Sequence, residues 1–316
     1  MLHERDWRLF GFFSEYQTTE IMNLWIRKIV LVLWEHPRLG LGVALASIVL
    51  LFAYVLPLYY TTDPFVQNLP SRLSPPVWLK GVIEHPLGTD QLGRDILSRL
   101  MMGTRISLQI GIGAVAVSAI FGTAMGMISG YLGGWVDTII QRWVELQMAF
   151  PFIVIALILM AFIRGTPWTI VLVFSFTGWP IYGRMIRGVT LAVRQKEFVE
   201  VAKSIGGLNT HILYHHILPN IINTAIVLAT LELSVLIYAE AALSFLGIGI
   251  QPPTPSLGVM LGEGRVYLSN AWWLATLPGL VLMIITLAVN FLGDGLREAL
   301  DPTLTESPNQ LRPGLV

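Results

Sequence analysis

The chain has 316 residues, of which 54% are hydrophobic and 13% are charged, and its mean hydropathy is +0.66. Soluble domains carry about 25% charged residues, so this composition indicates a membrane protein. The formal net charge is zero, which gives no sign of a nucleic-acid partner. The absence of cysteine excludes disulfides, thiol catalysis and thiolate metal sites. The polar opening residues carry no pattern of a secretory signal peptide.

Six apolar stretches are long enough to cross a bilayer as helices, because about 20 residues span a hydrocarbon core about 30 Å thick. They are approximately residues 39–60, 106–130, 142–163, 166–189, 221–250 and 271–293. The predicted fold class is therefore all-α, a polytopic membrane protein with about six transmembrane helices.

The distribution of basic residues predicts the orientation. Most of the 20 Lys and Arg residues lie on one side of this topology, and the positive-inside preference places that side, with both termini, in the cytoplasm. The predicted organisation is a cytoplasmic segment 1–38, a first span with its extracytoplasmic loop over 39–105, a five-span core over 106–304 and a cytoplasmic tail over 305–316. Within the core, residues 190–219 form the main cytoplasmic segment.

Small residues recur every four positions along the second span, and they leave one face of that helix almost without side chains. They are Ala114, Ser118, Gly122, Gly126, Gly130 and Gly134. Such a face lets another helix approach closely. That helix belongs either to the same chain or to a partner subunit.

The long outer loop contains the pattern of a short amphipathic helix over residues 90–100. Apolar residues share one face, while Asp90/Arg94 and Asp95/Arg99 are (i, i+4) pairs with the acid first. We expect this helix to lie at the outer membrane surface. It serves either as an interfacial brace or as a contact for a soluble partner.

The segment "EFVEVAKSIGG", residues 197–207, predicts a short amphipathic helix on the cytoplasmic side. Its apolar residues at helical spacing are Phe198, Val201, Ala202 and Ile205. Lys203 lies in the last turn, as the helix dipole favours, and Gly206 can supply a left-handed stop. A second short helix is expected from residues 209–210 to just before Pro219. The hairpin has no obvious cover from its own chain, which favours either a docked protein or a lipid surface.

Two acids lie within the fifth span, Glu232 and Glu240, and Ser244 follows Glu240 by one turn. A carboxylate in the membrane is costly and usually faces a water-filled cavity or a partner, so these residues are candidates for a translocation pathway. Hydrogen-bonded packing glutamates are the alternative interpretation of both acids.

No site for chemistry is expected. The chain contains no P-loop, no H-E-x-x-H and no G-x-S-x-G, and its cytoplasmic segments are too short to house an enzyme. Three histidines follow the hairpin turn, at His211, His215 and His216. No carboxylate lies near them in sequence, so no metal site is predicted there.

Together these segments resemble the inner-membrane permease subunits of ABC importers for dipeptides, oligopeptides and nickel, of the second (C-type) permease kind. The cytoplasmic signature of that family is E-A-A, three residues, Gly, nine residues and I-x-L-P. The matching positions here are Glu200, Val201, Ala202, Gly206, Leu218 and Pro219. Val201 replaces the middle alanine, and His216 stands in the place of the isoleucine. The blocks "HPLGTDQLGRDILSRLMMGTRISL" and "AEAALSFLGIGIQPPTPSLGVML" also look like this family, and the resemblance covers roughly residues 39–304.

The resemblance implies that the hairpin is a coupling helix that docks in a cleft of an ATP-hydrolysing subunit. The coupling residues are then Phe198, Glu200, Val201, Ala202, Lys203, Ile205, Gly206, Leu218 and Pro219. It also implies a second homologous permease, two ATP-binding subunits that hold ATP and Mg²⁺, and an extracytoplasmic substrate-binding protein. The chain itself is expected to be a non-catalytic subunit without a cofactor, in a bacterial or archaeal inner membrane.

Short peptides are the expected cargo, and nickel or a metal chelate is the alternative, because the resemblance covers permeases for both. A different class, an ion-coupled secondary transporter that works alone, would use Glu232 or Glu240 to carry protons. Folds of that class usually show paired repeats with broken helices near the midplane. No convincing internal repeat is present in this sequence.

Overall fold

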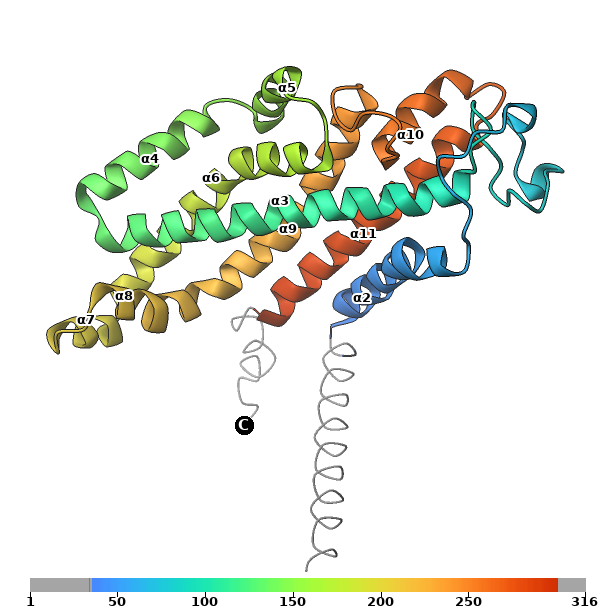
Figure 1. Ribbon diagram of the computed structural model, residues 1–316. Helices are drawn as coiled ribbons and strands as arrows, with labels where there is room; N and C mark the ends of the chain where they lie inside the picture. Colours follow the sequence, from blue (N-terminus) through green and yellow to red (C-terminus); the bar gives the residue numbers. More distant parts are fainter. Residues whose placement is uncertain (1–33, 35, 301–316) are drawn as a thin grey trace, which may run out of the picture.

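The computed structural model describes residue 34 and residues 36–300, and the regular structure in this part of the chain is helical (Figure 1). The helices are α2 (Pro37–Leu50), α3 (Ile96–Leu132), α4 (Gly134–Met148), α5 (Phe152–Phe162), α6 (Pro167–Arg194), α7 (Glu197–Ser204), α8 (Asn209–Ile212), α9 (Leu218–Phe245), α10 (Leu257–Gly264) and α11 (Trp273–Leu300). The predicted all-α class is confirmed. The predicted tail, and nearly all of the predicted N-terminal segment, lie outside the described residues.

Five helices are long and apolar enough to cross a membrane, and the number is six when the bent pair α4 and α5 is counted as one span. The five are α2 with its extension to Leu58, α3, α6, the continuous helix Asn209–Phe245 and α11. The predicted third span over 142–163 is not one continuous helix, because the chain bends by 82° between α4 and α5. Pro151 immediately precedes α5. Proline restricts the residue before it and lacks the N–H that a continuing helix needs, so the helix ends there.

Close backbone packing joins α3 to α6. A Cβ added at Gly122 would lie 2.5 Å from the carbonyl oxygen of Trp179, and one added at Gly126 would lie 2.6 Å from that of Gly183. Gly130 meets the next turn of α6 in the same way, so the two helices run parallel. Of the two explanations for the small-residue face, the structure therefore shows packing within the chain.

Gly134 does not belong to that packed face. It is the first residue of α4, its φ is +57°, and a Cβ placed on it would meet nothing within 4 Å. The preceding Gly133 has φ +68°. The four-residue spacing therefore continues past the end of α3, and Gly134 serves the turn between two helices. Its predicted packing role is wrong.

The outer segment over residues 59–95 has no surface helix of its own. Residues 96–105, which the sequence pattern assigned partly to that helix, are the first turns of the long α3. Gly93 has φ +73°, and the backbone N–H of Asp90 donates to the carbonyl of Arg94, so the chain turns sharply before α3. The Asp95 side chain caps α3 by accepting from the N–H of Ser98 at 2.8 Å.

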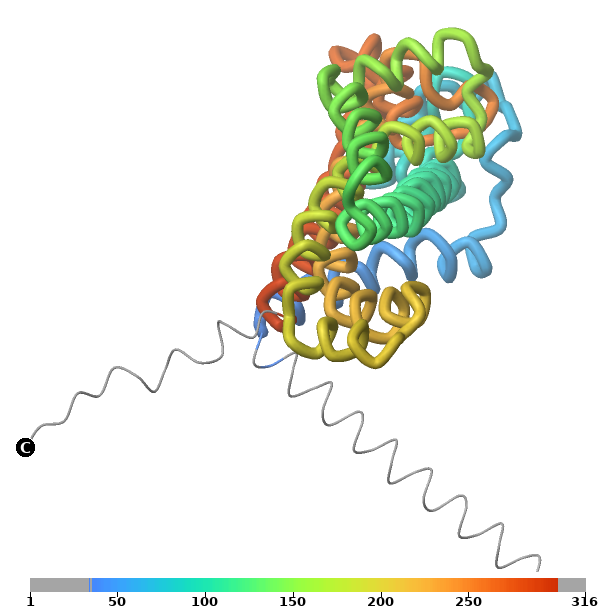
Figure 2. Tube along the Cα trace, turned by 90° about the vertical axis from the view of Figure 1, so that its left-hand side faces the viewer, coloured from blue at the N-terminus to red at the C-terminus, as the bar shows by residue number. Residues whose placement is uncertain are grey.

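Two views agree on which elements share a side of the molecule. The short helices α7 and α8 lie on the same side as the start of α2 and the end of α11 (Figures 1 and 2). The outer segment, α5 and α10 lie on the opposite side. The helical hairpin therefore shares its side with both ends of the described chain, as the predicted topology requires.

Candidate functional site

A tight turn joins α7 to α8. Gly206 has φ +82°, the left-handed conformation expected at a helix stop. The N–H of Gly206 donates to the carbonyl of Lys203, and that of Gly207 donates to Ala202, both at 3.0 Å. A Cβ on Gly206 would meet nothing within 4 Å, whereas one on Gly207 would lie 2.6 Å from the carbonyl oxygen of Ala202. The first glycine is therefore required for its backbone angle and the second for space.

One face of α7 is covered by its own chain. Val199 and Ala202 are buried in an apolar cluster with Ile212, Val193 and Tyr131. This corrects the predicted docking face, in which Ala202 was an outward residue. The helical spacing identified the apolar residues of α7 but not which of them face the chain's own core. Val199 also belongs to the apolar surface of the helix, and it shares the buried face with Ala202.

The other apolar face of α7 has no cover in the described chain. Val201 is 59% exposed and Ile205 is 81% exposed, and Phe198 is also exposed at the front of the helix. Leu208, just after the turn, adds to this surface. These four residues form the candidate docking face of the hairpin, which is called the docking face below. Large apolar side chains gathered on one exposed patch typically mark an interaction site.

Charged side chains border the docking face. Glu197 and Glu200 are exposed in the first turn, and Lys203 lies in the last turn. The Lys203 ammonium sits 5.0 Å from the centre of the Tyr131 ring, a cation–π contact. Partial burial, and then repulsion from Arg194, lower the pKa of Lys203. The border of the docking face therefore carries two acids at the start of α7 and, at its end, a cation that contacts an aromatic ring.

The second helix of the hairpin does not end before Pro219, contrary to the prediction. It continues from α8 through a π-helical turn, Leu213–Ile217, directly into α9. Leu218 and Pro219 are the first residues of α9, where a proline is tolerated because its missing N–H needs no partner in a first turn. The wider π-helical turn directly precedes that proline. The hairpin is consequently a direct extension of a membrane span.

The three histidines gather on the exposed side of this second helix. The rings of His211 and His215 stack with centroids 4.2 Å apart, and His216 lies 5.9 Å from His211. Among the described residues, no group of three His, Cys, Asp or Glu side chains is arranged to hold a metal ion. The histidines thus form a stacked surface cluster next to the docking face.

Glu240 is fully buried and hydrogen-bonded. Its Oε2 accepts from the Ser107 hydroxyl of α3 and its Oε1 accepts from the Ser244 hydroxyl one turn later, both at 2.7 Å. Ser244 in turn accepts from the N–H of Ile250 at 3.1 Å. Both carboxylate oxygens have partners, so the acid joins α3, α9 and the chain after α9. This arrangement is the one expected for a hydrogen-bonded glutamate that serves helix packing.

Glu232 has a different environment. It lines a cavity of about 210 Å³ between α6 and α9, together with apolar residues such as Ile181 and Val235. Its side chain is 7% exposed in relative area, and its Oε2 has no hydrogen-bond partner among the described residues. The buried hydroxyl of Tyr182 is the polar group that faces this carboxyl, although their geometry falls short of a regular hydrogen bond. An open acid at the wall of a cavity is the arrangement of the pathway alternative.

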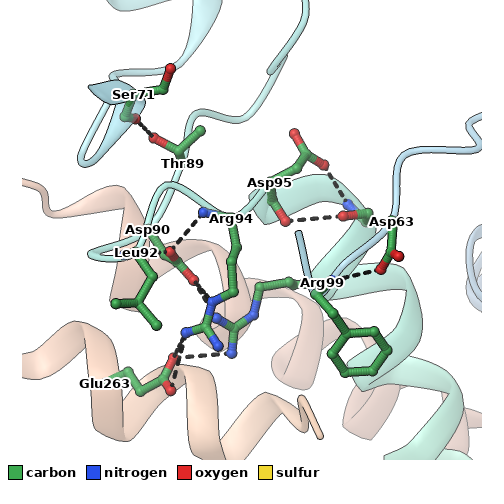
Figure 3. A network of polar contacts seen from close by, with 11 residues as sticks. Asp63, Ser71, Thr89, Asp90, Leu92, Arg94, Asp95, Arg99 and Glu263 are labelled. Atoms are coloured by element: carbon green, nitrogen blue, oxygen red, sulfur yellow. Dashed lines mark hydrogen bonds and ion pairs between the residues drawn. The ribbon is translucent and has the colours of Figure 1, made fainter. Parts of the chain in front are cut away.

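A buried network of charges, which the sequence pattern did not predict, fastens the opposite side of the molecule (Figure 3). Asp90 accepts from Arg94 Nε at 2.7 Å and also pairs closely with Arg99. Glu263 of α10 accepts from Arg99 at 3.0 Å and from Arg94 at 3.3 Å. The network joins the outer segment, α3 and α10. Of the two expected (i, i+4) pairs, Asp90/Arg94 is confirmed and Asp95/Arg99 is wrong.

Asp95 instead belongs to a second polar group. His85 Nδ1 lies 2.9 Å from Asp95 Oδ1, and the Tyr60 hydroxyl donates to the same oxygen at 3.1 Å. Burial raises the pKa of Tyr60 to about 12, so the hydroxyl keeps its proton and remains a donor. For the network of Asp90, Arg94, Arg99 and Glu263, the only signal in the sequence was the close spacing of Asp90, Arg94 and Arg99 next to an apolar helix face.

Comparisons with known proteins agree with this architecture. The profile of a family described as "Binding-protein-dependent transport system inner membrane component" matches residues 122–306. A dipeptide transport system permease protein of Haemophilus influenzae is 39% identical over 84% of this chain and 90% of its own length. One of Alkalihalophilus pseudofirmus is 38% identical over 83% and 85%. A glutathione transport system permease protein of Pectobacterium atrosepticum is 42% identical over 70% and 73%.

Proposed function

This chain belongs to the family of inner-membrane components of binding-protein-dependent transport systems, and from that premise we propose that it is one of two permease subunits of an ATP-driven importer. In this proposal the second permease is homologous. Two ATP-binding subunits hold ATP and Mg²⁺, and a substrate-binding protein delivers the cargo from outside. The chain itself performs no catalysis and carries no cofactor.

The observation that carries the proposal is the uncovered docking face of α7. Val201 and Ile205 are too exposed and too apolar to be explained by the core of this chain. Gly206 fixes the angle at which the face is presented. The docking face is the surface on which an ATP-binding subunit would sit, with Glu200 and Lys203 at the rim of the contact.

The connections of the hairpin support a role in coupling. Only two residues separate α6 from α7, and α8 continues without a loop into α9. A displacement of the hairpin by closing ATPases is therefore transmitted to both spans. The cavity that contains Glu232 lies between those spans. The same two helices, α6 and α9, thus connect to the hairpin and line the cavity that contains Glu232.

Within this mechanism we assign Glu232 to the translocation pathway and Glu240, with Ser244, to the stability of the outer end of α9. Glu232 has an oxygen without a partner at a cavity wall, and it can change its contacts at low cost. Glu240 would have to break two hydrogen bonds to do so. The two intramembrane acids therefore have different roles.

Short peptides are the proposed cargo. The relatives that cover most of this chain are named for dipeptide and glutathione transport, and glutathione is itself a tripeptide. Nickel or a metal chelate is the alternative that the same architecture would serve. Uptake assays with a dipeptide, and separately with nickel, distinguish the two cargoes.

The first test is a mild-detergent purification of the tagged chain from its native host, followed by mass spectrometry. The proposal expects an ATPase with a P-loop and a second six-span permease in the bound fraction. The reconstituted complex, with its binding protein, should then accumulate a dipeptide only when ATP is present. A single polypeptide that moves solute without ATP would overturn the proposal and would make Glu232 a candidate proton carrier.

The orientation is proposed as cytoplasmic for the hairpin and both termini, in the inner membrane. The chain has no cysteine, so single cysteines can be introduced without a background signal. A membrane-impermeant thiol reagent added to intact cells should label Lys80→Cys in the outer segment and spare Ile205→Cys in the hairpin. The reverse pattern would contradict this orientation.

A further inference from the structure

A cavity of about 470 Å³ lies on the outer side of the molecule, between the end of the first span and the first turns of α3. Its walls include Ala53, Tyr60, Asp63, Met102, Arg105 and Gln109. The lining residues include one cation, Arg105, one acid, Asp63, and several apolar side chains. Its volume falls in the usual range for small-molecule sites, which is about 300–1,000 Å³.

Arg105 has no acidic partner in the described part of the chain. No carboxylate there forms an ion pair with its guanidinium, and its Nε is buried without a hydrogen-bond acceptor. The guanidinium instead lies over the Tyr54 ring, 4.8 Å from the ring centre. Arg94 and Arg99 also lie near the start of α3, and both form ion pairs with Asp90 and Glu263. A half-buried cation without an anionic partner in its own chain is a favourable binding site for an anion from outside the chain.

The position of Arg105 along α3 matches the outer lipid headgroups. The helix has 37 residues, which corresponds to about 55 Å, whereas the hydrocarbon core is about 30 Å thick. We place the surplus length of α3 at its outer end, so that Arg105, the tenth residue of the helix, lies at the level of the headgroups. Pro57, at the end of the first span, lines the same cavity. Its neighbours Leu58 and Tyr59 are exposed, as is typical of residues that meet lipid at an interface.

We propose that this cavity binds one phospholipid whose headgroup carries both a phosphate and a free ammonium group. The guanidinium of Arg105 can hold the phosphate through two parallel hydrogen bonds, which suits its planar geometry. Asp63, an exposed acid that also lines the cavity, can hold the ammonium group. An acyl chain can follow the apolar residues Ala53, Met102 and Ile106.

The acid determines which lipid is preferred. Asp63, which is labelled in Figure 3, already accepts from the backbone N–H of Phe65 at 2.8 Å, and this contact orients its side chain. Its charge repels a lipid with a net negative headgroup and attracts a zwitterion of the phosphatidylethanolamine kind. The inference rests on the proposed function for the outward orientation of this surface, but it concerns a bound lipid and not the cargo, so that lipid retention and uptake can fail independently.

The test uses the full chain purified with its partners, stripped of lipid in detergent, and then mixed with equal amounts of phosphatidylethanolamine and phosphatidylglycerol. Native mass spectrometry counts the lipids retained per copy. We expect one phosphatidylethanolamine to be retained in preference, and Arg105→Gln to lower that retention about tenfold, the loss that corresponds to a charge-assisted hydrogen bond. Arg164→Gln removes the charge of an exposed arginine just before α6, outside this cavity, and as the control it should retain lipid normally.

A second variant tests the headgroup preference. Asp63→Asn keeps the oxygen that accepts from Phe65 and removes the charge, so it should raise the share of phosphatidylglycerol at the expense of phosphatidylethanolamine. If Arg105→Gln fails to assemble, Arg105→Lys replaces it, and a smaller loss of phosphatidylethanolamine is expected. Equal lipid retention in all variants would overturn the proposal. So would unchanged lipid retention with a selective loss of uptake for peptides that have a free carboxylate, which would make this a cargo site.

Discussion

The two ends of the molecule satisfy their exposed groups in opposite ways. On the outer side, Asp90, Arg94, Arg99 and Glu263 neutralise one another inside the chain, and the irregular segment before α3 is held by these contacts. On the hairpin side, Val201 and Ile205 remain in the open. The four charges of the outer side are thus paired within the chain, whereas the apolar docking face of the hairpin has no cover in the described chain.

The largest effect is expected from breaking the outer network. Arg99→Ala should destabilise the fold by about 3–5 kcal/mol, because it leaves two acids near each other with a single arginine between them. Arg99 is buried, with 2% of its side chain exposed. Thermal unfolding of the purified protein in detergent measures the loss. Arg142→Ala, which breaks an exposed pair with Glu145, is the control and should change stability by less than about 1 kcal/mol.

A smaller effect, confined to assembly, is expected at the docking face. Ile205→Asp should weaken the association with the ATP-binding subunits by about 30-fold, since a central apolar contact is typically worth about 2 kcal/mol. The unfolding temperature of the isolated chain should stay the same, because Ile205 contacts little of its own fold. Val199→Asp should do the reverse and destabilise the chain, because Val199 is fully buried. Equal association of wild type and Ile205→Asp would contradict the proposed docking face.

The turn between the two helices comes next. Gly206→Val should cost about 1–2 kcal/mol locally, because a side chain disfavours the left-handed angle even where space is available. We expect normal membrane insertion together with ATP hydrolysis that no longer drives uptake. Gly188→Ala, a helical glycine with nothing within 4 Å of its added Cβ, is the matched control and should transport normally. Coupled transport at the wild-type rate in Gly206→Val would refute the assignment.

The smallest effect is expected at the buried acid of the outer half. Glu240→Gln keeps the size and shape of the side chain and retains at least one hydrogen bond to Ser107 or Ser244. ATP-driven uptake should therefore fall by less than about twofold, within the usual range of a shape-preserving change. Glu232→Gln should lower uptake more strongly than Glu240→Gln. The opposite order in one uptake assay would exchange the roles given to these two acids.

Much of the architecture could be predicted from the sequence, because span length and glycine spacing are local properties. Six apolar stretches, the hairpin and the left-handed Gly206 are all readable in this way. The bend before α5 has a local cause in Pro151 and was readable in principle. The burial of Ala202 could not be read, because it depends on which residues of other elements lie alongside α7. The partnership of Arg99 with Glu263 joins positions 164 residues apart, and only the fold brings them together.

The absence of a loop between α8 and α9 gives the chain a single rod that runs from Asn209 to Phe245. Its 37 residues correspond to about 55 Å, so the rod is longer than the hydrocarbon core is thick. When such a rod tilts about a point near its middle, its two ends swing in opposite directions. In the proposed mechanism, inward movement at the docking face would therefore move the far tip outward, so that closing one side of the pathway would open the other.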